Sequence, residues 1–378
     1  MTQVVDLRTA DDPRDVIHRA VHLLAQGRLV AFPTDTVYVL AAASLRAEAI
    51  ARLESLRPAG PQRRSVLALK NWHEALDYVP DLSDVGQRLS RRCWPGPVTL
   101  QCATAADASL LRALPAESRA AVMTDSAANF RVPGHDVVLH MLRLMPAPLV
   151  MSETDAEGEV LRTAEDVQQR YGDQQRYGDA LDLIIDAGPC RYGEPSSVVR
   201  LEGDEWRLVE GGVVSEATVR RLAGEVFLFL CTGNTCRSPM AEAVFRKLLA
   251  DRLKCGEDDL PDRGYLITSA GLSATPGAPA AAEAIQAVRR LGADLGAHAS
   301  QPLTPQLLAQ ADHIYAMTHG HLETVLADCP EAAGRVRVLS QEGTDISDPI
   351  GGTQNDYDVC LEEIERNLRA IVADITGR

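Results

Sequence analysis

The chain has 378 residues, a length that exceeds one typical domain and predicts two domains of unequal size. Its formal net charge of -15 argues for solubility and against a general nucleic-acid or membrane partner. We expect a cytoplasmic protein, because residues 1–14 show no secretory signal pattern, no apolar run approaches a membrane span, and the 8 cysteines have no paired spacing.

Strands and helices alternate in the first part of the chain, which we assign to one domain of residues 1–223. Short apolar runs predict strands at residues 29–32, 66–69, 98–103, 149–152, 183–186 and 197–201. The spacing of apolar residues predicts helices at residues 47–56 and 84–91. This alternation is typical of an α/β domain with a mixed sheet.

Four motifs punctuate this domain. They are F-P-T-D-T-V-Y at Phe32–Tyr38, W-P-G-P-V-T-L at Trp94–Leu100, F-R-V-P-G-H at Phe130–His135, and D-A-G-P-C-R-Y-G-E-P-S-S-V-V at Asp186–Val199. Together they resemble the YrdC-like family of threonylcarbamoyl-adenylate synthases over about residues 10–222. The resemblance implies a mixed twisted sheet with helices, and an enzyme that condenses threonine, bicarbonate and ATP into the adenylate used to modify tRNA. It also implies a ligand site made of Thr34, Thr36, Tyr38, Arg57, Thr99, Arg131, Ser152 and Ser196.

The first domain departs from the pattern of that family at several positions. Ser55–Arg57 (S-L-R) stands where the family has Lys-x-Arg, Ser152–Thr154 (S-E-T) stands where it has Ser-x-Asn, and Val39 replaces a glycine. The missing lysine removes a cation that would offset the charge of a triphosphate. We expect Glu153, near the same site, to repel phosphate.

Two hypotheses for the first domain therefore stay open. In the first, it is a binding module that senses a nucleotide, an amino acid or RNA and that positions or regulates the second domain. In the second, it still uses ATP as a synthase, and the protein is bifunctional.

The second domain, residues 224–378, begins with a strand, a loop and a helix. Val226–Leu230 is a continuous apolar run that predicts a strand buried on both faces, and Ser238 followed by Pro239 predicts a helix cap and a first helical residue. The intervening C-T-G-N-T-C-R at Cys231–Arg237 is therefore a strand-to-helix loop. Backbone N–H groups of such a loop point inward and form a nest for phosphate oxygens.

This loop also supplies reactive side chains. The nest favours a thiolate at Cys231, which is then a nucleophile at neutral pH. The guanidinium of Arg237 can fork two phosphate oxygens and stabilise the charge of the transition state. Asp348 in D-P-I-G-G, on a loop before a helix predicted at residues 356–375, is the expected proton donor for the leaving group. We expect no metal or other cofactor here, because the nest and Arg237 already supply positive charge.

Further motifs follow the loop, namely T-S-A-G at Thr268–Gly271, H-A-S at His298–Ser300 and A-M-T-H at Ala316–His319. With the loop and D-P-I-G-G, they resemble the low-molecular-weight protein phosphatase family from about residue 225 to the end. The resemblance implies a Rossmann-like parallel sheet, a phosphorylated protein as substrate and a thiophosphate intermediate. It makes Cys231 the nucleophile, Arg237 the phosphate clamp, and Asp348 the general acid and later the base. The phosphate-binding loop would comprise Thr232, Gly233, Asn234, Thr235, Cys236 and Ser238, with support from Ser269 and His298.

Within that family, the details resemble the arginine phosphatases. Tyrosine-directed members usually have a branched apolar residue in place of Thr235 and aromatic residues after the Asp-Pro, where this chain has Ile350 and Gly351. A small wall with a hydroxyl and a nearby carboxylate, Asp345, suits a cationic guanidinium. We therefore predict phosphoarginine as the substrate, with phosphotyrosine as the alternative.

The cysteines after the nucleophile allow two hypotheses about redox chemistry. Cys236 is either a small buried residue or a trap that forms a reversible disulfide with oxidised Cys231. A thiol redox enzyme of the arsenate reductase type, which has the same fold, is disfavoured because Cys255, Cys329 and Cys360 are widely spread along the chain.

The sequence M-T-H-G-H brings His319 and His321 close together in the chain. A metal site needs at least a third ligand, and none is indicated nearby. We therefore interpret both histidines as polar surface residues.

Overall fold

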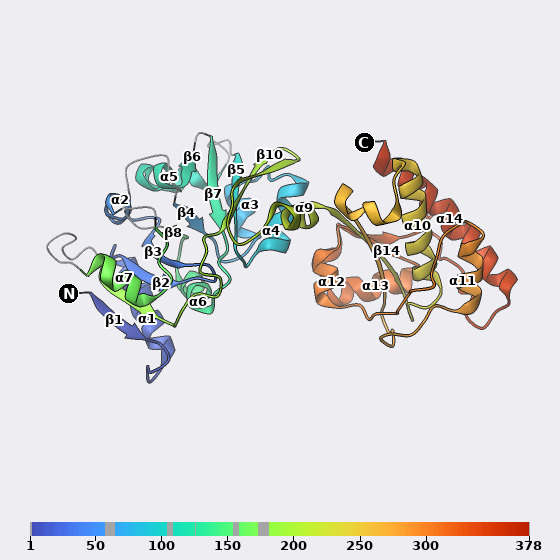
Figure 1. Cartoon of the computed structure of the whole chain (residues 1–378), viewed down its shortest axis with the longest axis horizontal. Coiled ribbons are helices and arrows are strands. Elements are labelled where there is room, and N and C mark those ends of the chain that lie inside the picture. The colour runs from blue at the N-terminus through green and yellow to red at the C-terminus, as the bar shows by residue number, and fades with distance from the viewer. Residues whose placement is uncertain are drawn as a thin grey trace. The chain divides into compact units, whose positions relative to one another are not determined.

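The computed structural model of the chain divides into two compact units, Met1–Leu222 (unit 1) and Ala223–Arg378 (unit 2) (Figure 1). It describes residues 2–56, 65–103, 109–124, 126–153, 159–172 and 181–377. Within these ranges, no helix combines the length and the hydropathy that crossing a membrane requires.

Unit 1 is built on an 11-stranded mixed sheet with the strand order β1-β9-β2-β3-β8-β4-β7-β5-β10-β11, and β6 pairs with β7. Its strands are β1 (Gln3–Asp6), β2 (Val30–Pro33), β3 (Tyr38–Ala43), β4 (Val66–Ala68), β5 (Val98–Ala103), β6 (Met123–Thr124), β7 (Ala127–Arg131), β8 (Leu149–Ser152), β9 (Leu183–Asp186), β10 (Ser197–Glu202) and β11 (Glu205–Glu210). Its helices are α1 (Pro13–Ala25), α2 (Ala47–Ser55), α3 (Glu74–Tyr78), α4 (Asp84–Cys93), α5 (Ala116–Val122), α6 (Asp136–Leu144), α7 (Ala164–Tyr171) and α9 (Glu216–Ala223). Parallel pairs such as β4 with β7 and antiparallel pairs such as β3 with β8 occur in the one sheet, so the expectation of a mixed sheet is confirmed.

Helices α1 and α6 pack on the first half of this sheet. The Asp12 side chain accepts a hydrogen bond from Arg14 N and so caps α1, and Pro13 occupies the first turn. The buried residues of α1 recur at helical spacing, from Val16 to Leu24, and they join Met141 of α6 in one core with the sheet. This packing holds in place the strand ends from which the polar residues of unit 1 project.

Unit 2 has a 4-stranded parallel sheet in the order β13-β12-β14-β15. Its strands are β12 (Glu225–Cys231), β13 (Tyr265–Gly271), β14 (His313–Ala316) and β15 (Val336–Val338). Its helices are α10 (Arg237–Leu253), α11 (Ala282–Arg289), α12 (Pro305–Gln310), α13 (His319–Asp328) and α14 (Gln354–Thr376). A parallel sheet between helices is the Rossmann-like arrangement that the sequence predicted.

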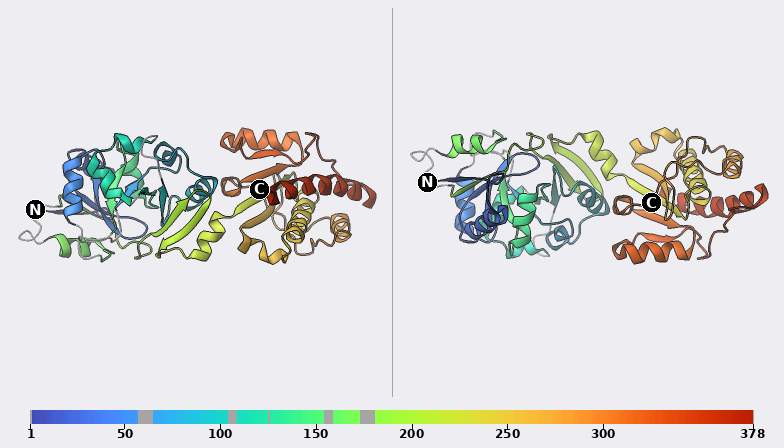
Figure 2. Two further views of the ribbon diagram at one scale, coloured as in Figure 1. Left: turned by 90° about the horizontal axis from the view of Figure 1, so that it is seen from above. Right: turned by 90° about the horizontal axis from the view of Figure 1, so that it is seen from below.

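The central strand β12 contributes to two cores, one on each face of the sheet. Phe227, Phe229 and Cys231 lie in the core shared with α10, α11 and α14. Leu228 and Leu230 lie in the core shared with α12 and α13. Figure 2 shows these two layers of helices from above and from below. Side chains alternate along a strand, so a continuous apolar run is what a strand covered on both faces requires.

Helix α10 begins at Arg237, earlier than predicted. Its N-cap residue is Cys236, which makes no side-chain cap hydrogen bond, and Ser238 and Pro239 both lie in the first turn. The prediction that Ser238 caps this helix is therefore wrong, because the Ser238 hydroxyl instead lies 3.0 Å from the Cys231 sulfur. Pro239 fits the first turn because the N–H group that it lacks has no partner within the helix at that position.

Candidate active site

The loop Cys231–Arg237 connects the carboxyl end of β12 to the first turn of α10. Its tightest point is Asn234, which has a φ of 55°. Asparagine tolerates this left-handed conformation better than most residues, since its short polar side chain forms local hydrogen bonds. In an open α/β sheet, ligands bind at the carboxyl ends of the strands, which is where this loop lies.

The carbonyl groups and the N–H groups of this loop differ in whether they are hydrogen-bonded within the protein. The carbonyl oxygens of Thr232 and Thr235 accept hydrogen bonds from Ser273 N and Ala281 N, each at 2.9 Å, so they point away from the centre of the loop. Among the described residues, the N–H groups of Thr232, Gly233, Thr235 and Cys236 donate to no protein acceptor. A ring of unpaired N–H groups at a helix start is the structure that binds the oxygens of a phosphate.

The thiol of Cys231 lies at this ring. The Cys231 sulfur is 3.0 Å from the Ser238 hydroxyl oxygen, and it accepts a hydrogen bond from Asn234 N at 3.2 Å. The sulfur is thus held by a backbone N–H group and lies beside a hydroxyl group that itself accepts from the Asn234 side chain.

A network of side chains holds Asn234 in its strained position. Its amide nitrogen donates to Ser238 Oγ at 3.0 Å and to Ser269 Oγ at 2.8 Å, and its carboxamide oxygen accepts from Gln301 N at 2.9 Å. His298 Nε2 donates to the carbonyl oxygen of Asn234 at 2.8 Å. The residues that the sequence suggested as loop support thus lie together, and Gln301 joins them. Ser269 in turn donates to Glu242 Oε2 at 2.6 Å.

The neighbouring strand β13 presses against the underside of the loop at Gly271. A Cβ atom at this position would lie 2.6 Å from the Thr232 carbonyl oxygen and 2.9 Å from Asn234 N. Real Cβ atoms do not approach backbone that closely, so only glycine fits here. This contact explains why the T-S-A-G motif ends as it does.

Arg237 and Asp348 meet at the loop although they come from different elements. Arg237 Nη2 donates to Asp348 Oδ2 at 2.6 Å, and Arg237 Nη1 lies 3.4 Å from the carbonyl oxygen of Ile346. The Arg237 side chain is only 6% exposed, whereas that of Asp348 is 45% exposed. An arginine fixed in the loop and a half-exposed carboxyl group beside it are the arrangement that a phosphate clamp and a proton donor require.

His321 is buried, contrary to its interpretation as a surface residue. Its Nε2 atom lies 2.9 Å from Thr232 Oγ1, and its Nδ1 atom lies 3.0 Å from Thr318 Oγ1. The Thr318 hydroxyl caps α13 by accepting from His321 N, so its own proton can go to Nδ1, and Nε2–H then donates to Thr232. Burial, and next the charge of Arg237, lower the pKa of His321. The spacing T-x-x-H, in which Thr318 caps α13 and His321 follows in its first turn, is the signal in the sequence that could have indicated this contact.

The two residues proposed to select the substrate occupy different surroundings. Thr235 is partly buried within the loop, and its hydroxyl lies 3.6 Å from the Cys236 sulfur. Asp345 is exposed and accepts hydrogen bonds from His319 N at 2.7 Å and His319 Nδ1 at 2.8 Å. These bonds lower the pKa of Asp345. Ile350, after Asp348, is 71% exposed, and its N–H donates to Asp348 Oδ1 at 3.2 Å.

Cys236 is buried behind the loop and has a specific partner. Its sulfur lies 3.3 Å from the Tyr357 hydroxyl oxygen at the start of α14. Burial and this contact raise the pKa of Tyr357. Cys360 lies one helical turn further on, and burial raises the pKa of its thiol to about 12.

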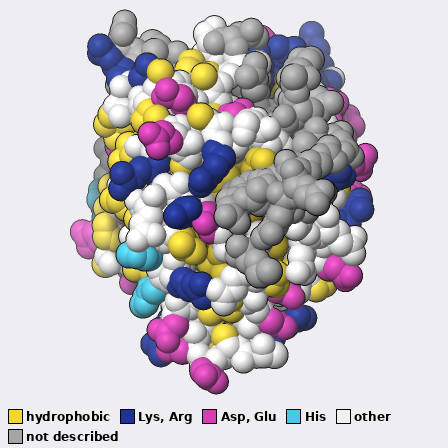
Figure 3. Space-filling model, turned by 90° about the vertical axis from the view of Figure 1, so that its left-hand side faces the viewer, with side chains coloured by type: hydrophobic (Ala, Val, Ile, Leu, Met, Phe, Trp, Pro, Cys, Tyr) yellow, Lys and Arg dark blue, Asp and Glu magenta, His cyan; other side chains and the backbone are white. Residues whose placement is uncertain are grey.

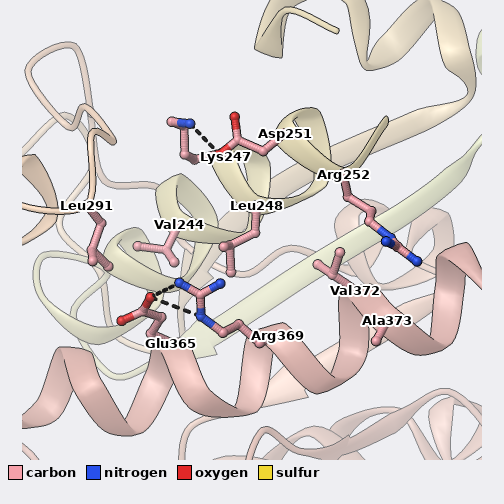
Figure 4. Close-up of a pocket in the computed structure, with 10 residues that line it drawn as sticks. All are labelled: Val244, Lys247, Leu248, Asp251, Arg252, Leu291, Glu365, Arg369, Val372 and Ala373. Atoms are coloured by element: carbon pink, nitrogen blue, oxygen red, sulfur yellow. Dashed lines mark hydrogen bonds and ion pairs between the residues drawn. The ribbon is translucent and has the colours of Figure 1, made fainter. Parts of the chain in front are cut away.

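A cavity of about 570 Å³ lies elsewhere in unit 2, between α10 and α14 (Figure 4). Four of its charged lining residues form two pairs, Lys247 with Asp251 and Arg369 with Glu365, while Arg252 Nε donates to Thr376 Oγ1. No residue of the phosphate-binding loop lines it. It therefore does not belong to the site described above.

The polar residues predicted as a ligand site in unit 1 also gather, around a buried arginine. The side chain of Arg131, at the end of β7, is 0% exposed and pairs with both Asp35 and Glu153. Thr34 and Thr36 lie in the turn between β2 and β3, with their hydroxyl oxygens 2.9 Å apart, and Thr36 accepts from Arg131 Nη1.

The other residues of the predicted ligand site do not all lie near Arg131. Ser196 lies 2.8 Å from the Thr99 hydroxyl oxygen and also donates to Glu153, and Ser152 ends β8 directly before Glu153. Tyr38 is directed elsewhere, because its hydroxyl donates to the carbonyl oxygen of Gly188 at 2.8 Å. Arg57 and Thr154 lie outside the described residues.

Across the described ranges, there is no cluster of three or more His, Cys, Asp or Glu side chains that could hold a metal ion.

Comparison with known proteins matches both halves of the chain. Residues 226–377 match the family model described as low molecular weight phosphotyrosine protein phosphatase, and residues 22–212 match the Sua5, YciO and YrdC model described as telomere recombination. The chain is 35% identical over 152 residues to the protein-arginine-phosphatase of Bacillus subtilis strain 168, covering 39% of this chain and 95% of that protein. It is 29% identical over 226 residues to a putative threonylcarbamoyl-AMP synthase of Mycobacterium leprae strain TN, covering 60% of this chain and 96% of that protein.

One solved structure is similar over most of the chain. A variant of Sua5 from Pyrococcus abyssi matches with a TM-score of 0.51 and 19% identity, covering 89% of this chain and 98% of that one. At this identity the similarity concerns the fold alone.

Proposed function

We propose that this chain, which belongs to the low molecular weight phosphatase family through unit 2 and to the Sua5, YciO and YrdC family through unit 1, is a cysteine-dependent phosphatase of phosphorylated proteins. The observation that supports the activity most is the Cys231 sulfur at a ring of unpaired N–H groups, with Arg237 and Asp348 joined beside it.

The reaction proceeds in two displacements. The Cys231 thiolate attacks phosphorus, so that an S–P bond forms while the bond from phosphorus to the leaving nitrogen or oxygen breaks. Asp348 gives its proton to that leaving atom. Water then attacks the thiophosphate, Asp348 accepts a proton from it, and inorganic phosphate leaves as the S–P bond breaks. Throughout, the N–H ring and Arg237 stabilise the charge on the phosphoryl oxygens.

The proposed substrate is phosphoarginine in proteins. A hydroxyl at Thr235 in place of a branched apolar group, an exposed carboxylate at Asp345, and the absence of an aromatic residue at Ile350 and Gly351 favour a guanidinium over a phenyl ring. The name of the Bacillus relative points in the same direction, while the description of the family model names phosphotyrosine, so phosphotyrosine is the alternative.

Release of inorganic phosphate from matched peptides tests both parts of this proposal. The full chain, kept reduced, is incubated with a phosphoarginine peptide and with a phosphotyrosine peptide of the same flanking sequence. We expect faster release from phosphoarginine and none from either peptide with Cys231→Ser. An inactive reduced protein would reject the phosphatase, whereas faster release from phosphotyrosine would reject only the substrate assignment.

For unit 1 we propose a role in binding and not in catalysis. Arg131, the only described arginine of the predicted ligand site, is already paired with two carboxylates, so its charge does not offset that of a triphosphate. On the face drawn in Figure 3, described basic and acidic side chains are interspersed, which does not favour RNA over a nucleotide or an amino acid as the ligand. The similarity to the Mycobacterium leprae protein supports the second candidate, a synthase that uses ATP. Release of pyrophosphate from ATP that depends on threonine and bicarbonate would establish the second candidate and reject the binding role.

A further inference from the structure

We propose that Glu153 is a built-in anion that occupies an anion subsite of unit 1, formed by Arg131 and Ser196, and keeps small carboxylates out of it. This inference rests on the proposed binding role of unit 1 and identifies what closes the site. It follows from the hydrogen bonds of three side chains.

Arg131 has little capacity left for an external ligand. A guanidinium has five N–H donors. In Arg131, Nε donates to the Gly96 carbonyl oxygen at 3.0 Å, Nη2 donates to Asp35 Oδ1 at 2.6 Å, and Nη1 contacts both Thr36 Oγ1 and Glu153 Oε1. The carboxylate of Glu153 thus occupies the place at Nη1 where the oxygen of a bound anion would lie.

The second carboxylate oxygen of Glu153 accepts hydrogen bonds from a hydroxyl group and a backbone N–H group. Glu153 Oε2 accepts from Ser196 Oγ at 2.8 Å and from Ser196 N at 3.3 Å. A guanidinium on one oxygen, with a hydroxyl and a backbone N–H on the other, is a donor set that recognises a free carboxylate. Glu153 therefore satisfies donors that a ligand would otherwise satisfy.

Charge also disfavours a second anion at this place. Asp35 and Glu153 carry two negative charges against one positive charge on Arg131, and all three side chains are at most 5% exposed. Asp35 Oδ1 is further fixed by Gly134 N at 2.8 Å. If the Glu153 carboxylate is removed, Arg131 and Asp35 balance each other, and Arg131 Nη1 faces the volume that the carboxylate occupied, beside Ser196, whose hydroxyl oxygen also lies 2.8 Å from Thr99 Oγ1.

Chemical rescue of the full-length protein tests this directly. The thermal unfolding midpoint of the wild type, Glu153→Ala and Glu153→Gln is followed during titration with sodium formate, with sodium chloride at equal ionic strength as the reference. We expect formate to raise the midpoint of Glu153→Ala saturably, by about 4 °C or more, and to leave the wild type unchanged. Glu153→Gln is the matched control, because it removes the charge and still fills the volume, so we expect no saturable response from it.

The possible outcomes separate the inference from the binding role of unit 1. A formate response equal in all three proteins, or absent from Glu153→Ala, would overturn the occupied subsite. If Glu153→Ala does not fold in chloride, refolding yield replaces the midpoint, and recovery that requires formate supports the inference while no recovery refutes it. Threonine-dependent synthase activity of the wild type would reject the binding role, and the formate titration would still decide whether Glu153 fills the subsite.

Discussion

Arg237 and Asp348 are 111 positions apart in the chain, yet Arg237 Nη2 and Asp348 Oδ2 lie 2.6 Å from each other. The substitution Asp348→Asn removes the ionisable carboxyl group of this pair and tests whether Asp348 donates a proton to the leaving group. We expect Asp348→Asn to lower kcat/KM toward phosphoarginine or phosphotyrosine by about 10²–10⁴-fold, because kcat/KM reports the first displacement, in which the leaving atom is then expelled without a proton. With para-nitrophenyl phosphate, whose leaving group needs little protonation, the loss should be much smaller. An equal loss on both substrates would show that Asp348 acts on loop geometry and not as an acid.

Arg237→Lys tests the clamp separately. A lysine keeps the charge but cannot bond two phosphoryl oxygens side by side, so we expect kcat/KM to fall by about 10²–10³-fold. Circular dichroism melting serves as the control, because Arg237 also contacts Ile346 and Asp348. Near-normal kcat/KM in a folded variant would refute the bidentate role.

Thr235→Ile tests the choice of substrate. A branched apolar side chain in place of the hydroxyl should shift the ratio of kcat/KM values from phosphoarginine toward phosphotyrosine by about tenfold or more. Thr232→Ile, on the same loop, is the matched control and should shift this ratio less. If the two variants change the ratio equally, Thr235 is not the selecting residue.

His321 should make the stability of unit 2 depend on pH. Burial and the nearby charge of Arg237 lower its pKa in the folded protein below the usual value of 6.5. The unfolded chain therefore binds more protons than the folded one as the pH falls below about 6.5, and stability declines in that range. We expect His321→Gln, which can still donate to Thr232, to show a smaller fall in unfolding midpoint between pH 7.5 and pH 5 than the wild type. An identical fall in both proteins would mean that His321 does not titrate in this range.

Oxidation distinguishes the two hypotheses about Cys236. If Cys236 traps an oxidised Cys231, peroxide first converts the Cys231 thiolate to a sulfenic acid, and the Cys236 thiol then displaces water to form a disulfide. Activity lost to peroxide should return with dithiothreitol in the wild type and should not return in Cys236→Ser. Mass spectrometry should find the disulfide in the first protein alone. Equal recovery in both would leave Cys236 as a buried residue that packs with Tyr357.

Much of the architecture could be predicted because local signals agreed with long-range packing. The strands at Val98–Ala103, Leu149–Ser152 and Leu183–Asp186 have the expected bounds, since nearly all of their residues are buried within the sheet. Strand β11 was not predicted, because charged residues interrupt its apolar ones and leave no apolar run, although it forms a hairpin with β10. Helix α3 was also missed, since five residues give no helical period.

The residues of the site could be predicted where they belong to one continuous motif. They were harder to predict where the contacting residues come from elements far apart in the chain. The loop residues and Asp348 could be named from their types and spacing. The burial of His321 could not, because it depends on how α13 packs beside the loop. The pairing of Glu153 with Arg131 was likewise hidden, because it joins residues at the ends of different strands that only the folded sheet brings together.

Gly271 makes the shape of the anion-binding loop depend on β13 as well as on β12. The bare backbone of β13 leaves just enough room for the Thr232 carbonyl and the Asn234 amide above it. If the seven residues from Cys231 to Arg237 were transplanted onto the end of another strand, the same side chains would be present but the loop conformation would not form. It would form only if the adjacent strand also ended in a residue without a side chain.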